Sequence, residues 1–196
     1  MKQDIILSGV GGQGILSIAT IIGWAALEEN LFLKQAEVHG MSQRGGDVQS
    51  NLRLSTQPIH SDLIPLGGCD LIISLEPMES LRYIQYLSKD GWIITNTSPF
   101  INIPNYPDIE LINKELDSIG NVIKIDADAI AKEIKAPRSA NMVLLGATAS
   151  VLKILSKEKL LEGIGKVFSS KGEEIVNTNT EAFNAGYNYA QRFINK

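Results

Sequence analysis

The sequence predicts a three-layer α/β domain with a mostly parallel sheet, an antiparallel excursion and a helical C-terminal third. Short β-rich apolar runs alternate with segments of helical periodicity, a pattern typical of sheets covered by helices on both faces. A cluster of glycines, Gly9-Val10-Gly11-Gly12-Gln13-Gly14, directly follows the first apolar run. The chain of 196 residues can build one substantial core, so we expect residues 1–196 to form a single domain.

The first four expected elements surround the glycine cluster. The apolar run 4–8 predicts a buried strand, and 14–29 has the periodicity of a helix. A second strand over 33–38 completes a unit of the size of a βαβ element. Residues 48–54 alternate between apolar and polar side chains, so this strand has one wet face and is expected to be antiparallel.

The remaining elements continue the alternation. The apolar run 69–75 predicts a strand that ends at Glu76-Pro77, and Pro77 suits the first turn of a helix over 79–87. A strand over 92–96 precedes a loop over 97–108 that is rich in proline and asparagine. The other expected elements are a strand over 121–125 and helices over 127–134, 141–155, 157–167 and 180–195.

Composition excludes several classes of protein. A net charge of −4 argues against a general binder of nucleic acid or of anionic membranes. The single cysteine, Cys69, excludes an intrachain disulfide and a metal or iron–sulfur site built from several thiolates. The apolar stretch from Ile15 to Leu27 is too short to span a bilayer, and the sequence opens with no signal-peptide pattern. We therefore expect a cytoplasmic protein that binds no metal.

The glycine cluster is the first candidate site. Glycines between a strand and a helix allow a tight turn, close approach of the backbone to a ligand, and an anion at the N–H groups of the helix. A dinucleotide site also needs an acidic residue about 20 residues further on, and Glu37 is the nearest candidate. The alternative is a turn that packs the fold or binds another anion. Both interpretations predict a Rossmann-like domain.

The second candidate site is the polar loop Ser42-Gln43-Arg44-Gly45-Gly46. An arginine offers fork-shaped donors to a carboxylate or a phosphate. Because parallel strands end at the same edge of a sheet, we expect this loop to share a crevice with the glycine cluster. The alternative is a glycine hinge that carries a solvated arginine.

Further candidates follow expected strands. Glu76 and Asn96 would line the same edge, or else serve as a helix-start glutamate and a turn residue. His39 is expected to be a hydrogen-bonding loop residue, and Cys69 a small buried one. No catalytic residue is identified. The candidate ligand-binding residues are Gly9, Gly11, Gly12, Gln13, Gly14, Ser42, Gln43, Arg44, Gly45, Gly46, Glu76 and Asn96.

In combination, the glycine cluster and the Gln-Arg-Gly-Gly loop resemble the gamma-type subunit or domain of 2-oxoacid:ferredoxin oxidoreductases, and in particular the indolepyruvate branch of that family. Further blocks support the resemblance and occur in the family's order along nearly the whole chain. They are Ser50-Asn51-Leu52-Arg53, Leu75-Glu76-Pro77-Met78-Glu79-Ser80-Leu81-Arg82, Thr95-Asn96-Thr97, Asn141-Met142-Val143-Leu144-Leu145-Gly146-Ala147 and Asn177-Thr178-Asn179-Thr180-Glu181-Ala182-Phe183-Asn184-Ala185-Gly186.

The resemblance implies a subunit of an enzyme that oxidatively decarboxylates a 2-oxoacid, here an arylpyruvate, to an acyl-CoA. It implies that thiamine diphosphate, magnesium and iron–sulfur clusters lie on a larger partner subunit, with CoA as co-substrate and ferredoxin as electron acceptor. This chain would shape the substrate or CoA side and be inactive alone. Two alternative functions stay open: a free-standing nucleotide-binding oxidoreductase, and a small module that binds CoA or another anion. A homodimer of the isolated chain is also open.

Overall fold

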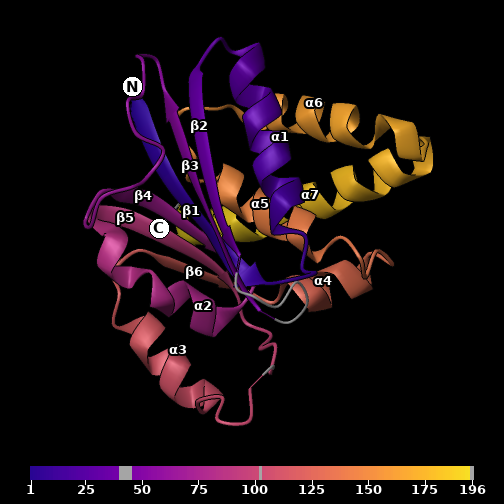
Figure 1. The fold of residues 1–196 in the computed structure, drawn as a ribbon. Helices are drawn as coiled ribbons and strands as arrows, with labels where there is room; N and C mark the ends of the chain where they lie inside the picture. The colour runs from indigo at the N-terminus through magenta and orange to yellow at the C-terminus, as the bar shows by residue number, and fades with distance from the viewer. Residues whose placement is uncertain (40–45, 102, 195–196) are drawn as a thin grey trace.

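The computed structural model describes residues 1–39, 46–101 and 103–194. Within these ranges, six strands form one sheet of order β2-β3-β1-β4-β5-β6 (Figure 1). β3 is antiparallel to both β1 and β2, whereas β1, β4, β5 and β6 pair in parallel. The predicted mostly parallel sheet with an antiparallel excursion is therefore confirmed. The strands are β1 (Lys2–Val10), β2 (Phe32–His39), β3 (Asp47–Ser55), β4 (Cys69–Ser74), β5 (Leu87–Asn96) and β6 (Val122–Ile125).

Helices cover both faces of the sheet, which confirms the three layers (Figure 1). The larger core lies beneath α1, α5, α6 and α7, and the smaller one beneath α2 and α3. The predicted helical C-terminal third is confirmed by the run from α4 to α7. The helices are α1 (Ile15–Glu28), α2 (Pro77–Arg82), α3 (Ile109–Asp117), α4 (Ala127–Glu133), α5 (Ala140–Ala149), α6 (Lys157–Phe168) and α7 (Glu173–Ile194).

Short polar side chains start several of these helices. Asp108, Asp126 and Ser156 each accept a hydrogen bond from a backbone N–H in the first turn of α3, α4 and α6. Those N–H groups have no carbonyl partner within the helix, so the cap satisfies them and fixes where the helix begins. Separately, eight of the nine residues of β1 are buried, as expected for a strand that is covered on both faces.

Some predicted boundaries are wrong, each for a local reason. The helix expected over 79–87 ends at Arg82, because Leu87 already pairs with Cys69 in a longer β5. The helix expected over 141–155 ends at Ala149, because the N–H groups of Lys153 and Ile154 donate to Gln3 Oε1 at 3.0 and 3.2 Å.

The structure also adds helical residues at two places. α3 was not predicted, although Asp108 followed by an amphipathic segment is a recognisable helix start. α7 begins at Glu173, seven residues before the helix expected over 180–195. Ile175 and Val176 are the apolar residues of its first two turns and are followed by polar residues over 177–181, so apolar periodicity becomes visible only further along.

Candidate functional site

A tight glycine turn joins β1 to α1 at the carboxyl edge of the sheet. Gly12 and Gly14 have φ angles of 103° and 86°, in the left-handed region that other residues rarely adopt. Gly14 is the N-cap of α1 and offers no side-chain acceptor to the helix. The first N–H groups of α1 therefore lack a side-chain cap, the condition under which a helix start attracts an anion.

The Gln13 side chain braces this turn from within. Its Oε1 accepts a hydrogen bond from the Val10 N–H at 2.7 Å, and its Nε2 donates to the Leu75 carbonyl at 3.1 Å. The amide thus connects the end of β1 to the residue that follows β4. Because both ends of the amide have backbone partners, Gln13 positions the turn, and the backbone of the glycines is what remains exposed to a ligand.

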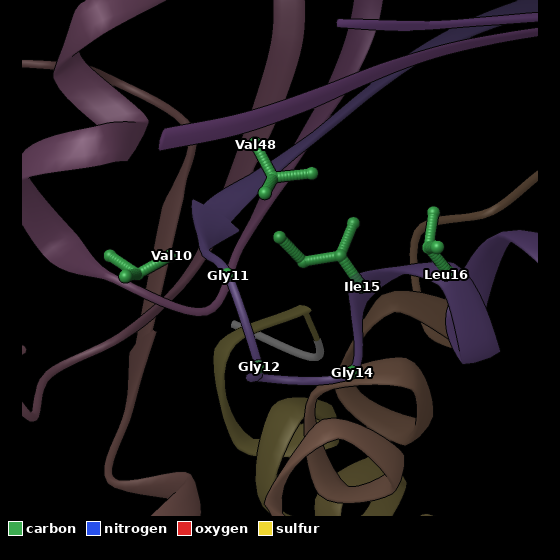
Figure 2. A pocket seen from close by; sticks show the side chains of 7 residues that line it. All are labelled: Val10, Gly11, Gly12, Gly14, Ile15, Leu16 and Val48. Atoms are coloured by element: carbon green, nitrogen blue, oxygen red, sulfur yellow. The ribbon is translucent and has the colours of Figure 1, made fainter. Parts of the chain in front are cut away.

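Two cavities adjoin the turn, and Gly12 borders both. The first has a volume of about 280 Å³; Figure 2 shows the side chains of Ile15 and Val48 on one side of the turn that carries Gly12 and Gly14. Leu16, at its rim, is 44% exposed. The apolar lining of this cavity suits an apolar group rather than a charge. The lining residues are Val10, Gly11, Gly12, Gly14, Ile15, Leu16 and Val48.

The second cavity is polar and has a volume of about 380 Å³. It lies where parallel strands end, the place at which open α/β sheets bind ligands. Three of its polar residues, Asp128, Arg138 and Asn141, were not singled out from the sequence. The sequence does contain a signal for Asp128. This residue closely follows β6, and the end of β6 shares this edge of the sheet with Asn96. The lining residues are Gly12, Gln13, Leu75, Asn96, Asp128, Pro137, Arg138, Ala140 and Asn141.

Asn96 lies at this polar cavity, as expected, but its side chain is engaged by the protein. Its Nδ2 donates to Asp128 Oδ2 at 2.8 Å and to the Leu75 carbonyl at 3.4 Å, and its Oδ1 accepts from the Ala127 N–H at 3.1 Å. Asn96 therefore fixes the start of α4 against the ends of β4 and β5, and Asp128, its hydrogen-bond partner, lines the same cavity.

Glu76 takes the helix-start role, the alternative that the sequence left open. Its side chain is fully buried and caps α2, with Oε2 accepting from the Glu79 N–H at 2.8 Å. Oε1 accepts from the Phe100 N–H at 3.3 Å and from the Tyr106 hydroxyl. Glu76 lines neither cavity at the glycine turn. Burial, together with the hydrogen bond to Glu76, raises the pKa of Tyr106 above its ordinary value.

The polar loop reaches the glycine turn through its last residue. The Gly11 N–H donates to the Gly46 carbonyl at 2.9 Å, so the two candidate segments meet as expected. Ser42, Gln43, Arg44 and Gly45 lie outside the described residues. Gly9 is near the end of β1, where an added Cβ would lie 2.8 Å from Gln13 Oε1. The absence of a side chain at Gly9 therefore leaves space for the Gln13 side chain.

The arrangement does not match a dinucleotide site that uses Glu37. In such a site the second strand lies beside the first, which brings its acidic residue to the ribose. Here β3 separates β2 from β1, and Glu37 Oε1 accepts from Gln35 Nε2 at 2.6 Å on an exposed edge strand. The interpretation of Glu37 as a ribose ligand is therefore wrong, because topology carries it away from the turn.

Three further observations concern the part of the chain that the structure describes. There, no group of three or more histidine, cysteine, aspartate or glutamate side chains is placed to hold a metal ion. Among the same residues no helix is both long and apolar enough to cross a membrane. Cys69 is buried in β4, as expected, and burial raises its pKa to about 12.

The sheet order, the helical layers and the glycine turn define a Rossmann-like α/β protein with an open crevice at the carboxyl edge. Comparison with known proteins identifies the family within this class. Residues 4–189 match the family model described as pyruvate ferredoxin/flavodoxin oxidoreductase, and the chain belongs to this family.

The relatives are similar along the whole chain. The chain is 37% identical to the indolepyruvate oxidoreductase subunit IorB of Pyrococcus horikoshii, over 100% of both sequences. The pyruvate oxidoreductase subunit PORC of Thermotoga maritima has the same fold, with a TM-score of 0.74 and 23% identity over 95% of this chain and 96% of that one.

A third relative is much longer. The 2-oxoglutarate:ferredoxin oxidoreductase of Magnetococcus marinus, solved with 2-oxoglutarate, coenzyme A and succinyl-CoA, has a TM-score of 0.77 and 24% identity over 97% of this chain. The present chain spans about a third of that chain, 31% of its length. The shared fold is thus a separate subunit in some relatives and part of a longer polypeptide in another.

Proposed function

We propose that this chain is the small subunit of a ferredoxin-linked oxidoreductase that converts arylpyruvates, indolepyruvate above all, with CoA to acyl-CoA. The observation that carries the proposal is the 37% identity to an indolepyruvate oxidoreductase subunit over the full length of both chains. Pyruvate- and 2-oxoglutarate-acting relatives have lower identities to this chain, at 31% or below. An aromatic 2-oxoacid is therefore the best-supported substrate class.

The thiamine diphosphate, magnesium and iron–sulfur clusters of such an enzyme are proposed to lie on a larger partner subunit, from which ferredoxin takes electrons. The side chains described here do not fit those groups. The sole thiol, Cys69, is buried, whereas a cluster needs about four thiolates. Thiamine diphosphate supplies the decarboxylation chemistry when bound. In this proposal, the residues of this chain bind and orient substrate and CoA. We propose a cytoplasmic location for the complex.

We propose that the carboxyl edge around the glycine turn is the side that this chain presents to substrate, CoA and the larger subunit. Backbone groups of Gly11, Gly12 and Gly14 would contact the acyl-CoA side, and Ser42, Gln43, Arg44 and Gly45 would complete it. Three observations support this: a turn braced from within by Gln13, uncapped N–H groups at the start of α1, and apolar side chains around the first cavity. An apolar rim is typical of a surface that becomes buried on assembly.

Reconstitution tests the proposed activity. The chain is co-expressed with the thiamine-binding subunit, and ferredoxin reduction is measured with indolepyruvate, phenylpyruvate, pyruvate and 2-oxoglutarate in the presence of CoA. We expect activity to require both chains and to be greatest with the two arylpyruvates. Equal activity without this chain would overturn the subunit role, and a preference for pyruvate would overturn the substrate class.

Variants of Leu16 and Leu27 test which end of α1 contacts the larger subunit. Both are exposed, at 44% and 61%, but Leu16 borders the glycine-turn cavity and Leu27 lies at the far end of the helix. We expect Leu16→Asp to weaken association with the larger subunit at least about tenfold, since it introduces a charge that would have to be desolvated. Leu27→Asp is the matched control. Equal association of both variants would place the interface elsewhere.

A further inference from the structure

A third cavity lies between the α4–α5 connection and the start of α7. Its volume of about 610 Å³ is within the range of small-molecule sites. It shares Pro137, Arg138 and Asn141 with the polar cavity, so the two adjoin along this connection. The lining residues are Ser17, Lys135, Ala136, Pro137, Arg138, Ser139, Asn141, Phe168, Lys171, Ile175, Thr178 and Asn179.

The charge of this cavity is opposite to that of the protein. Lys135, Arg138 and Lys171 line it, and none of its described lining residues is acidic, although the chain carries a net charge of −4. None of the three forms an ion pair with a carboxylate of the described residues. Three cations that line one cavity without a carboxylate partner among the described residues repel one another, and a bound anion removes that repulsion.

The backbone adds donors and a fixed geometry. Lys135 has a φ of 58°, an uncommon conformation for a residue with a side chain, which directs the chain from α4 back toward α5. The N-cap of α5, Ser139, makes no capping hydrogen bond, because its Oγ donates to Asn179 Oδ1 at 3.0 Å. The Met142 N–H donates to Asn141 Oδ1 at 3.0 Å, so the first N–H groups of α5, at Ala140 and Asn141, are those that Ser139 leaves without a side-chain cap. A helix start of this kind favours an anion.

Part of the cavity lining is apolar. Phe168 and Ile175 face the same cavity, and the Lys171 ammonium lies 5.2 Å from the centre of the Phe168 ring. A cavity of about 610 Å³ that is lined by both cationic and apolar side chains is larger than a free phosphate needs. It matches a molecule in which phosphate groups are attached to a ring.

We propose that this basic pocket binds a nucleotide, with its phosphates held by Lys135, Arg138 and Lys171 and its ring placed against Phe168 and Ile175. The pocket is also connected to the glycine turn, because Asn141 lines it and donates from Nδ2 to the Gly14 carbonyl at 3.2 Å. A nucleotide here contacts a residue that holds the turn in place.

Calorimetric titration of the purified chain tests the proposal without a partner subunit or an enzymatic assay, so it succeeds or fails independently of the proposed function. The probes are ADP, pyrophosphate and adenosine. We expect ADP to bind with a stoichiometry of one, pyrophosphate to bind more weakly, and adenosine not to saturate. Binding of ADP should weaken as salt is raised, because exposed cations are screened. Failure of ADP to saturate at millimolar concentration overturns the proposal, and equal affinity for pyrophosphate overturns the role of the ring.

Charge-neutral variants locate the site. Arg138→Gln is expected to weaken ADP binding about tenfold, since it removes a charge-assisted donor. The triple variant with Lys135→Gln, Arg138→Gln and Lys171→Gln is expected to abolish it. Lys89→Gln removes the same charge from exposed residues of β5 and is the matched control. Circular dichroism verifies that each variant is folded. Unchanged ADP affinity in the triple variant, or equal loss in Lys89→Gln, would overturn the assignment.

Discussion

At the scale of single residues, the candidate site is built from polar side chains that hold the backbone in place. Gln13 bridges β1 and the residue after β4, Asn96 fixes the start of α4, and Glu76 caps α2. Glu76 and Asn96 are buried and Gln13 is half-buried, and each of the three side chains has hydrogen-bond partners in the protein. Because an unpaired buried polar group destabilises the folded state, removal of one hydrogen-bond partner is expected to lower the free energy of unfolding.

Tyr106→Phe tests this at Glu76. The variant removes the hydroxyl that donates to Glu76 Oε1 and leaves a buried carboxylate oxygen with only the Phe100 N–H. We expect the free energy of unfolding to fall by about 1–3 kcal/mol, the cost of a lost hydrogen bond to a charged group. Urea denaturation measures it. Tyr86→Phe is the control, because no hydrogen bond of the Tyr86 hydroxyl is found among the described residues. A loss as large in the control would contradict the argument.

Cys69 gives a prediction with a defined pH dependence. Burial raises its pKa from the ordinary 9.0 to about 12, so the neutral thiol is the form that the fold favours. Its contribution to stability is present below pH 9 and is lost as the pH rises toward 12. We expect iodoacetamide to label the native protein at pH 8 far more slowly than the protein in guanidinium chloride. Rapid native labelling would show that the thiol is accessible.

At the scale of elements, the crossing of α5 and α7 depends on two glycines. A Cβ at Gly146 would lie 1.8 Å from the Phe183 carbonyl oxygen, and a Cβ at Gly186 would lie 1.8 Å from the Val143 carbonyl oxygen. The backbones of the two helices are therefore in direct contact. This contact brings α7 onto α5, and α5 in turn carries Asn141 to the glycine turn.

Gly146→Ala is expected to destabilise the protein by about 3 kcal/mol or more, because neither backbone can move aside without disturbing the core. The control is Gly165→Ala in α6, where an added Cβ meets nothing within 4 Å. The control should be neutral or more stable by about 0.5–1 kcal/mol, since alanine favours a helix. Thermal or urea unfolding of the two variants measures both effects. Similar stability of the two variants would contradict the close crossing.

The elements themselves were largely readable from the sequence, whereas their ends were not. Alternation predicted the antiparallel β3, and apolar periodicity predicted α1 and α6 to within about a residue at each end. The end of α5 depends on Gln3, about 150 residues away, and the end of α2 depends on the pairing of Leu87 with Cys69. Such long-range partners leave no signal in a local window of sequence.

At the scale of the whole molecule, β3 decides which function the glycine turn can serve. Its insertion between β1 and β2 takes Glu37 away from the turn, and leaves the turn in contact with Gly46 instead. The same edge then collects Asn96, Asp128 and the start of α5 from later parts of the chain. The sheet order thus replaces a dinucleotide site with an open crevice at this edge, the one that we propose faces the larger subunit.

One cooperative unit is expected from this architecture. We propose that residues 1–196 are a single domain, because the larger core joins side chains from β1, α1, β3, β4, α5 and α7. Differential scanning calorimetry should give one transition whose calorimetric and van't Hoff enthalpies agree. Two resolved transitions would contradict the proposal and divide the helical C-terminal third from the sheet.

By itself, the sequence determined the α/β class, the family resemblance and the position of the glycine turn, because these depend on short-range periodicity and on residue types at fixed spacing. It also placed Glu76 and Asn96 at the ends of strands. Only the tertiary structure decided that Glu76, Asn96 and Gln13 hold the backbone, and that Arg138 joins Lys135 and Lys171 around one cavity. Those roles are set by partners that chain folding brings together from distant positions.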